Sequence, residues 1–254
     1  MKRFVVTVTA VLLAMTALPA SAEAADPVSA LKAQLSKYRG VTIVERGTEP
    51  TKKVVGIRAK VLVKLDRSGR PVASDCTLMT LGYEDVPRHH RDIIVDGRMY
   101  YWGRIFNGGS PVLPEGKQWV LRNGKAQPAV GFLQMVNVLE PATLGALLKS
   151  ATTTRRGKGE TLYSGAVSLS EIYKVSSSLR AVLPKGFTGE RVILNWQLST
   201  DSKGLIRRLV TSEKSSETTD GLILDTRFSD WRPEVTIRAP RADEVANESE
   251  VGYE

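Results

Sequence analysis

Residues 92–102 read DIIVDGRMYYW, and this stretch decides the fold class. Two apolar runs flank Asp96-Gly97, a pair that accepts the positive φ angles of a tight hairpin turn. Apolar residues recur at every second position between residues 41 and 120, as expected for strands with one buried face. They include Val41 and Ile43 in one strand, where Glu45 is a possible third inward position, and Ile57, Ala59, Val61, Val63 and Leu65 in the next. The sequence therefore predicts an antiparallel meander.

In three segments outside the meander, apolar residues recur at the three- and four-residue spacing of an amphipathic helix. Asp26-Pro27 supplies an N-cap and a proline at the first helical position, and Gly40 ends the segment. A second block starts at Pro128 and restarts at Pro141. A third begins with a capping box formed by Ser168 and Glu171. Residues 151–158 are polar and predict a loop, while strands return from Val192 to Ile237.

These elements predict an α+β fold with one large curved antiparallel sheet, a half-barrel, and amphipathic helices over its concave face. Three short helices rarely fill such a concavity, so we expect an apolar ligand cavity between the helices and the sheet. Its expected lining is Phe132, Met135, Val136, Leu139, Leu147, Leu148, Ile172, Val175 and Leu179.

The N-terminus has the features of a secretory signal peptide at residues 1–22. Lys2 and Arg3 precede an apolar run that ends near Leu18, and Ala20-Ser21-Ala22 offers a cleavage site. Cleavage after Ala24 is the alternative, and an uncleaved N-terminal anchor is another. We therefore expect a secreted or cell-envelope protein with one domain over residues 23–240 and a loose acidic tail over 241–254.

Charge and cysteine content limit the partners. The formal net charge is +9, but Lys and Arg are spread along the chain, so nucleic acid is not an expected partner. An anionic membrane surface is more plausible. Cys76, the only cysteine, excludes a disulfide within the chain and lies far from the cleavage site, so no lipid anchor is expected. Ser74, Cys76 and Leu78 share a strand face, which predicts that the Cys76 thiol is buried. We also expect the protein to be a monomer.

Residues suited to catalysis are sparse. His89 and His90 are adjacent and would point to opposite faces of a strand, which makes them a poor pair of metal ligands. Glu84, Asp85 and Asp92 lie near enough to complete a metal site or a hydrolase site, but a polar connection between strands is the favoured interpretation. Nucleophile-elbow and phosphate-loop motifs are missing from the sequence. We therefore expect no enzyme activity, cofactor or metal.

The order of these segments resembles a known group of proteins. Asp96–Trp102 lies in the middle of the chain, Gly116-Lys117-Gln118-Trp119 follows, and Phe228-Ser229-Asp230-Trp231 comes near the end. This layout resembles the LolA, LppX and LprG group of envelope lipid carriers and the RseB type of sensor domain. The resemblance implies a half-barrel with a lipid cavity. The chain departs from the LppX and LprG branch because it has no cysteine near its cleavage site.

Two functions follow from this resemblance. In the first, the protein binds a lipid or acyl chain in the cavity and carries it within the cell envelope. In the second, the same fold is a protein-interaction or sensor module that meets a membrane-anchored protein without transporting a ligand.

Overall fold

The computed structural model of the chain describes residues 25–49, 54–80, 88–103, 110–128, 130–131, 133–187, 189, 191–214 and 222–253. The expected signal peptide lies outside the described residues. Strands of the first half are β1 (Gly40–Glu49), β2 (Val54–Leu65), β3 (Pro71–Thr80), β4 (Arg88–Val95), β5 (Arg98–Gly103), β6 (Pro111–Val112) and β7 (Trp119–Leu121). Those of the second half are β8 (Ala151–Arg156), β9 (Glu160–Ser168), β10 (Ile193–Asp201), β11 (Ile206–Lys214), β12 (Ile223–Arg232), β13 (Val245–Asn247) and β14 (Gly252–Tyr253).

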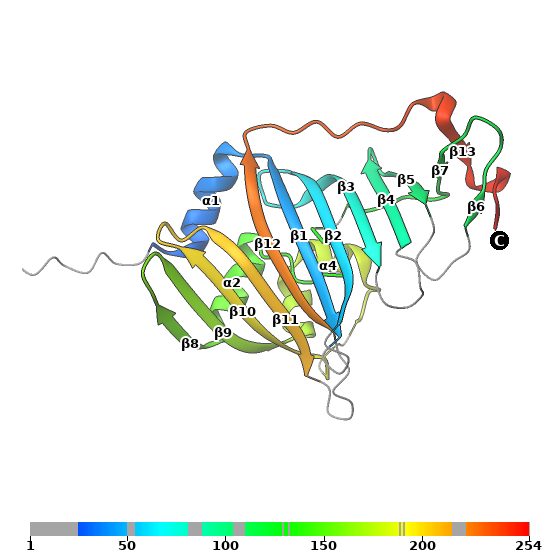
Figure 1. Cartoon of the computed structure of the whole chain (residues 1–254). Coiled ribbons are helices and arrows are strands. Elements are labelled where there is room, and N and C mark those ends of the chain that lie inside the picture. Colours follow the sequence, from blue (N-terminus) through cyan, green and yellow to red (C-terminus); the bar gives the residue numbers. More distant parts are fainter. Residues whose placement is uncertain are drawn as a thin grey trace, which may run out of the picture.

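One twelve-stranded sheet dominates the described residues. Its order is β13-β7-β5-β4-β3-β2-β1-β12-β11-β10-β9-β8, so β1 and β12 join the two halves of the chain at its centre. Neighbouring strands are antiparallel, except that β13 lies parallel to β7. The sheet is curved and open, with β13 and β8 at its edges (Figure 1). The expected α+β half-barrel is confirmed.

The helices lie against one face of this sheet. They are α1 (Pro27–Lys37), α2 (Pro141–Lys149), α3 (Leu169–Val175) and α4 (Ser177–Val182). Figure 1 shows α2 and α4 behind the sheet, while β12, β1 and β2 present their other face uncovered. Asp26 caps α1 by accepting the backbone N–H groups of Val28 and Ser29, and Ser168 and Glu171 form the expected capping box.

Strand alternation builds the core on the helix-covered face. Val41, Ile43 and Glu45 of β1 point inward, opposite Val63, Val61 and Ala59 of β2. Leu31 and Leu35 of α1, Leu144 and Leu147 of α2 and Ile172 of α3 complete the core from the helical side. Burial of this area from water stabilises the concave arrangement at roughly 25 cal/mol per Å² of apolar surface.

The expected helix over residues 128–139 is wrong. Its described residues have no helical structure, and residues 130–131 and 133–140 form a non-helical strap along the concave face. Side chains, rather than carbonyls four residues earlier, accept the N–H groups of Leu133, Gln134, Val136 and Leu139. Helical spacing of apolar residues therefore misled the prediction. Glu45 binds two of these N–H groups from another part of the chain, and the side chains of Gln134 and Asn137 bind the other two from two residues earlier.

Three smaller expectations are also corrected. The third helical block is two helices, because Ser176 ends α3 and caps α4. Residues 151–156 form the edge strand β8 instead of a loop, paired to β9. The C-terminal residues are not a loose tail, since β13 adds to the sheet beside β7 and β14 pairs with β6.

Candidate functional site

A buried carboxylate fixes the first half of the strap. Glu45 of β1 points into the concave face and is fully buried. Its Oε1 accepts the backbone N–H of Leu133 at 2.8 Å, and its Oε2 accepts that of Gln134 at 3.1 Å. A Cβ at Gly131 would collide with the same carboxylate, so a residue without a side chain is required there. The strap is thus attached to the central strand of the sheet.

Two amide side chains continue the attachment. The Gln134 amide donates to the hydroxyls of Thr211 at 3.1 Å and Thr226 at 3.2 Å, and its oxygen accepts the N–H of Val136. Asn137 donates to the carbonyl of Gly69 at 3.4 Å in the turn between β2 and β3. These contacts satisfy the polar groups that an extended segment brings into a core.

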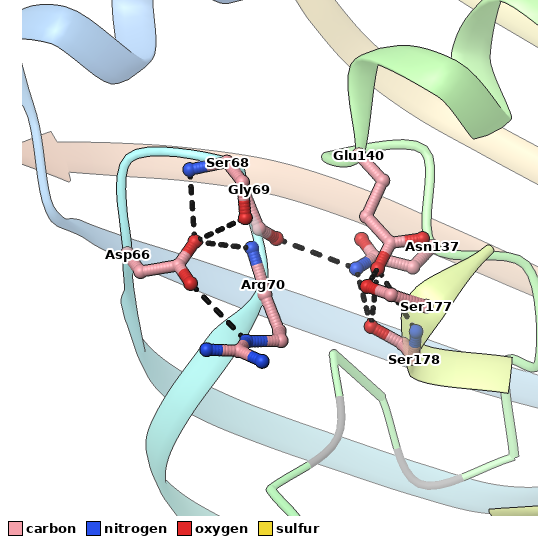
Figure 2. Close-up of polar contacts among 8 residues, drawn as sticks. All are labelled: Asp66, Ser68, Gly69, Arg70, Asn137, Glu140, Ser177 and Ser178. Carbon is pink, nitrogen blue, oxygen red and sulfur yellow. Dashed lines mark hydrogen bonds and ion pairs between the residues drawn. The ribbon is translucent and has the colours of Figure 1, made fainter. Parts of the chain in front are cut away.

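Glu140 anchors the end of the strap to the start of α4. Its carboxylate accepts hydrogen bonds from the Ser177 and Ser178 hydroxyls at 2.5 and 2.8 Å and from the Ser178 N–H at 2.9 Å (Figure 2). It also accepts a hydrogen bond from the Ser176 hydroxyl at 2.7 Å. Burial alone would raise the pKa of Glu140, but the hydrogen bonds from Ser177, Ser176 and Ser178 outweigh it and hold that pKa below its usual range. The carboxylate is therefore ionised at neutral pH.

An apolar cleft opens between the first half of the strap and the concave side of β10, β11 and β12. Its volume is about 340 Å³. The side chains that line it are mainly apolar, with Met135 exposed over 41% of its surface. The lining consists of Leu133, Gln134, Met135, Leu194, Thr211, Ser212, Glu213, Leu222 and Leu224. About 300–1,000 Å³ is usual for ligand sites, so this cleft is at the small end of the range.

The residues expected to line a cavity take different places. Met135 lines this cleft, and Phe132 lies outside the described residues. Val136, Leu139, Leu147, Ile172 and Leu179 are at most 1% exposed in the core, while Leu148 is partly buried and packs against it. Val175 is partly buried at the end of α3. A ligand that reached the five core residues would have to displace helices or the strap.

Sequence reasoning missed most of the cleft. Leu194, Leu222 and Leu224 lie within the segment predicted as strands, and their place at an opening follows from the strap. A signal for the strap was present, since Glu45 occupies an inward position of a strand whose other inward residues are apolar. A carboxylate at such a position needs buried donors, and here the free N–H groups of a non-helical segment supply them.

A second polar group lies on the inner wall at β4. His90 Nε2 and Asp92 Oδ1 are 2.6 Å apart, both side chains are buried, and Cys76 lies opposite Asp92 on β3. Burial, with the charges of Asp92 and Glu45, raises the pKa of the Cys76 thiol. His89 is exposed on the other face, and Glu84 and Asp85 lie outside the described residues. Groups of three or more side chains that could hold a metal ion do not occur among the described residues.

Comparisons with known proteins give a distant structural likeness. No family model and no curated protein matches the chain. The structure of LprF from Mycobacterium bovis is 12% identical over 84% of this chain and 95% of its own, with a TM-score of 0.46. A β-barrel-like protein of a domain of unknown function from Brucella abortus is 10% identical over 76% and 98%, with a TM-score of 0.23.

At these TM-scores, neither likeness bears on family or function. Within the described residues, helices with the length and apolar character needed to cross a membrane do not occur.

Proposed function

We propose that this chain is exported to the cell envelope and binds a lipid or another apolar ligand there, without catalysis. The observation that carries this proposal is the apolar cleft beside Met135, on the concave side of a half-barrel. Each methylene buried there contributes about 0.8 kcal/mol, so half an acyl chain gains several kcal/mol without any polar contact.

The strap gives the cleft a way to enlarge. Leu133 and Met135 form one side of the cleft, and the hydrogen bonds that Glu45 accepts and the Gln134 amide donates hold that side in place. An acyl chain longer than the cleft would have to move this segment away from β11 and β12. It would then reach the expected lining residues Val136 and Leu139, which are buried in the core.

Non-catalytic binding agrees with the chemistry of the inner wall. Cys76 retains its proton because burial raises the pKa of the thiol, so it is not an activated nucleophile. The His90–Asp92 pair is buried on both side chains and lies on β4, at a distance in the sheet order from the cleft strands β10 to β12.

The closed core favours a second candidate function. Five of the nine expected lining residues are packed side chains, so the fold as it stands holds a small cleft and a solid interior. A protein-interaction or sensor module of the envelope would have such an interior and would present a sheet edge or a helix face to a membrane-anchored protein.

Native mass spectrometry of the chain after mild purification separates the two. The carrier predicts an added acyl mass, or uptake of a fluorescent sixteen-carbon fatty acid, and Met135→Asp should weaken that uptake at least tenfold by charging the exposed side of the cleft. Val112→Asp charges an equally exposed side chain on β6 and should leave uptake unchanged. A chain seen only at its bare mass that takes up no probe would contradict the carrier and favour the interaction module.

A further inference from the structure

The uncovered face of the sheet carries a band of cations. Arg208, Arg227, Lys60 and Arg91 lie in one cross-strand row, linked by register through Val44 and Thr77, and the row crosses six strands from β11 to β4. In the next row Arg46 lies directly opposite Arg58. We call these six residues the basic band. Strands are about 4.8 Å apart, so the band spans roughly 24 Å.

The cations of the band are only partly neutralised. Asp225 binds both nitrogens of the Arg208 fork at 2.7 and 2.9 Å and contacts Arg227 at 3.4 Å, and Asp75 binds Arg91. Arg46, Arg58 and Lys60 have no ion pair with any described residue, and all three are exposed. Two carboxylates therefore face six cations over the central strands.

Like charges directly opposite each other on neighbouring strands destabilise a sheet, and Arg46 and Arg58 are such a pair. Asp225 lies opposite Arg46 on β12, whereas no carboxylate lies opposite Arg58 on β1 or β3. Apolar side chains lie among the cations, including Val44, Val210 and the exposed Ile223. Figure 1 shows no helix over this face at β12, β1 and β2. Exposed cations mixed with apolar groups are suited to the boundary between lipid headgroups and acyl chains.

We propose that the basic band docks the protein on an anionic lipid bilayer through the outer face of β11, β12, β1 and β2. A continuous array of phosphate headgroups can contact several cations of a strip that crosses six strands, whereas a single small anion would need only one or two of these side chains. The attraction acts within a Debye length, about 8 Å at physiological ionic strength, so docking must weaken with salt. This inference does not depend on the apolar cleft, which lies on the other face.

Vesicle sedimentation with the full chain tests the proposal. The parent should bind vesicles that contain phosphatidylglycerol at least tenfold more tightly than vesicles of phosphatidylcholine alone, and added salt should abolish the difference. The triple variant Arg46→Gln, Arg58→Gln, Lys60→Gln should lose at least tenfold of this binding. It should remain folded by circular dichroism, because the substitution removes a repulsive pair.

A second triple variant controls for the loss of net charge. The parent, the band variant and this control variant all share the same N-terminal segment, so that segment cannot cause a difference between them. Lys125→Gln, Lys158→Gln, Lys185→Gln removes the same charge from exposed turns away from the band and should bind within about threefold of the parent. Equal losses of vesicle binding in the two triple variants would overturn the proposal, since net charge alone would then explain the binding. Binding of the band variant at the parent level, or band-dependent binding to a DNA duplex but not to vesicles, would overturn it as well.

Discussion

Glu45 and Leu133 are 88 residues apart in the sequence, yet the Glu45 carboxylate accepts the Leu133 backbone N–H at 2.8 Å inside the core. The contact joins the central strand of the sheet to the segment that borders the apolar cleft. It gives the strap a fixed position without regular secondary structure. The stability of the cleft and the stability of the fold are therefore coupled through one carboxylate.

Replacement of Glu45 should loosen the strap. Glu45→Gln keeps the size of the side chain but turns an acceptor into a donor that faces the N–H of Leu133 or Gln134. We expect the free energy of unfolding to fall by about 1–3 kcal/mol, the usual cost of a buried group left without its partner. Urea unfolding measures the loss, and amide hydrogen exchange should accelerate at Leu133 and Gln134. Glu115→Gln, in an exposed turn, is the control; equal exchange in both variants would show that Glu45 does not hold the strap.

Ionised Glu140 should make the fold sensitive to acid. Its folded-state pKa lies below the ordinary value, so its contribution to stability is complete above the unfolded pKa and is lost as the pH falls through the folded pKa. Glu140→Gln should therefore destabilise the protein most at neutral pH, by about 1–3 kcal/mol. The difference in unfolding free energy between parent and variant should shrink below about pH 4.5. A difference that stays constant from pH 7 to pH 3 would contradict this linkage.

The turn between β2 and β3 should tolerate only glycine at residue 69. Gly69 has a φ of +83°, and a Cβ there would collide with the carbonyl of Leu139 in the strap. Gly97 has a φ of +73° in the β4–β5 hairpin with open space around it, so it is a matched control. Gly97→Ala should cost about 1–2 kcal/mol of stability, the cost of a left-handed conformation alone. Gly69→Ala should cost clearly more. Equal midpoint temperatures of thermal unfolding for Gly69→Ala and Gly97→Ala would show that the strap does not limit the space at this turn.

The sheet was predictable because its signals are local. Asp96 and Gly97 have φ angles of 52° and 73°, as the hairpin required, and the inward residues of β2 are those that alternate in the sequence. Ser168 and Glu171 likewise are only three positions apart in the chain and form a capping box. Each of these features depends on neighbours in the chain, so one sequence suffices to find it.

The strap was not predictable from its own residues. Val136 and Leu139 have helical spacing, and nothing near them shows that Glu45 and Thr226 would bind the neighbouring backbone and amide groups. The cleft depends on the strap, so its lining was missed for the same reason, apart from Met135. Contacts between segments about 90 residues apart decide this region, and periodicity does not contain them.

Cys76 should report on whether the inner wall opens. Its thiol is buried on β3 between Val61 and Asp92, and burial with the nearby carboxylates raises its pKa. Because only the thiolate reacts, and each unit of pKa lowers its fraction about tenfold, a soluble disulfide reagent at pH 8 should label the folded chain far more slowly than the urea-unfolded chain. Glu45→Gln should leave this labelling slow if only the strap loosens, and accelerate it if the β1–β3 wall opens as well. Rapid labelling of the folded parent would mean that the concave wall is already open at β3, and that the packed interior described for this region does not persist in solution.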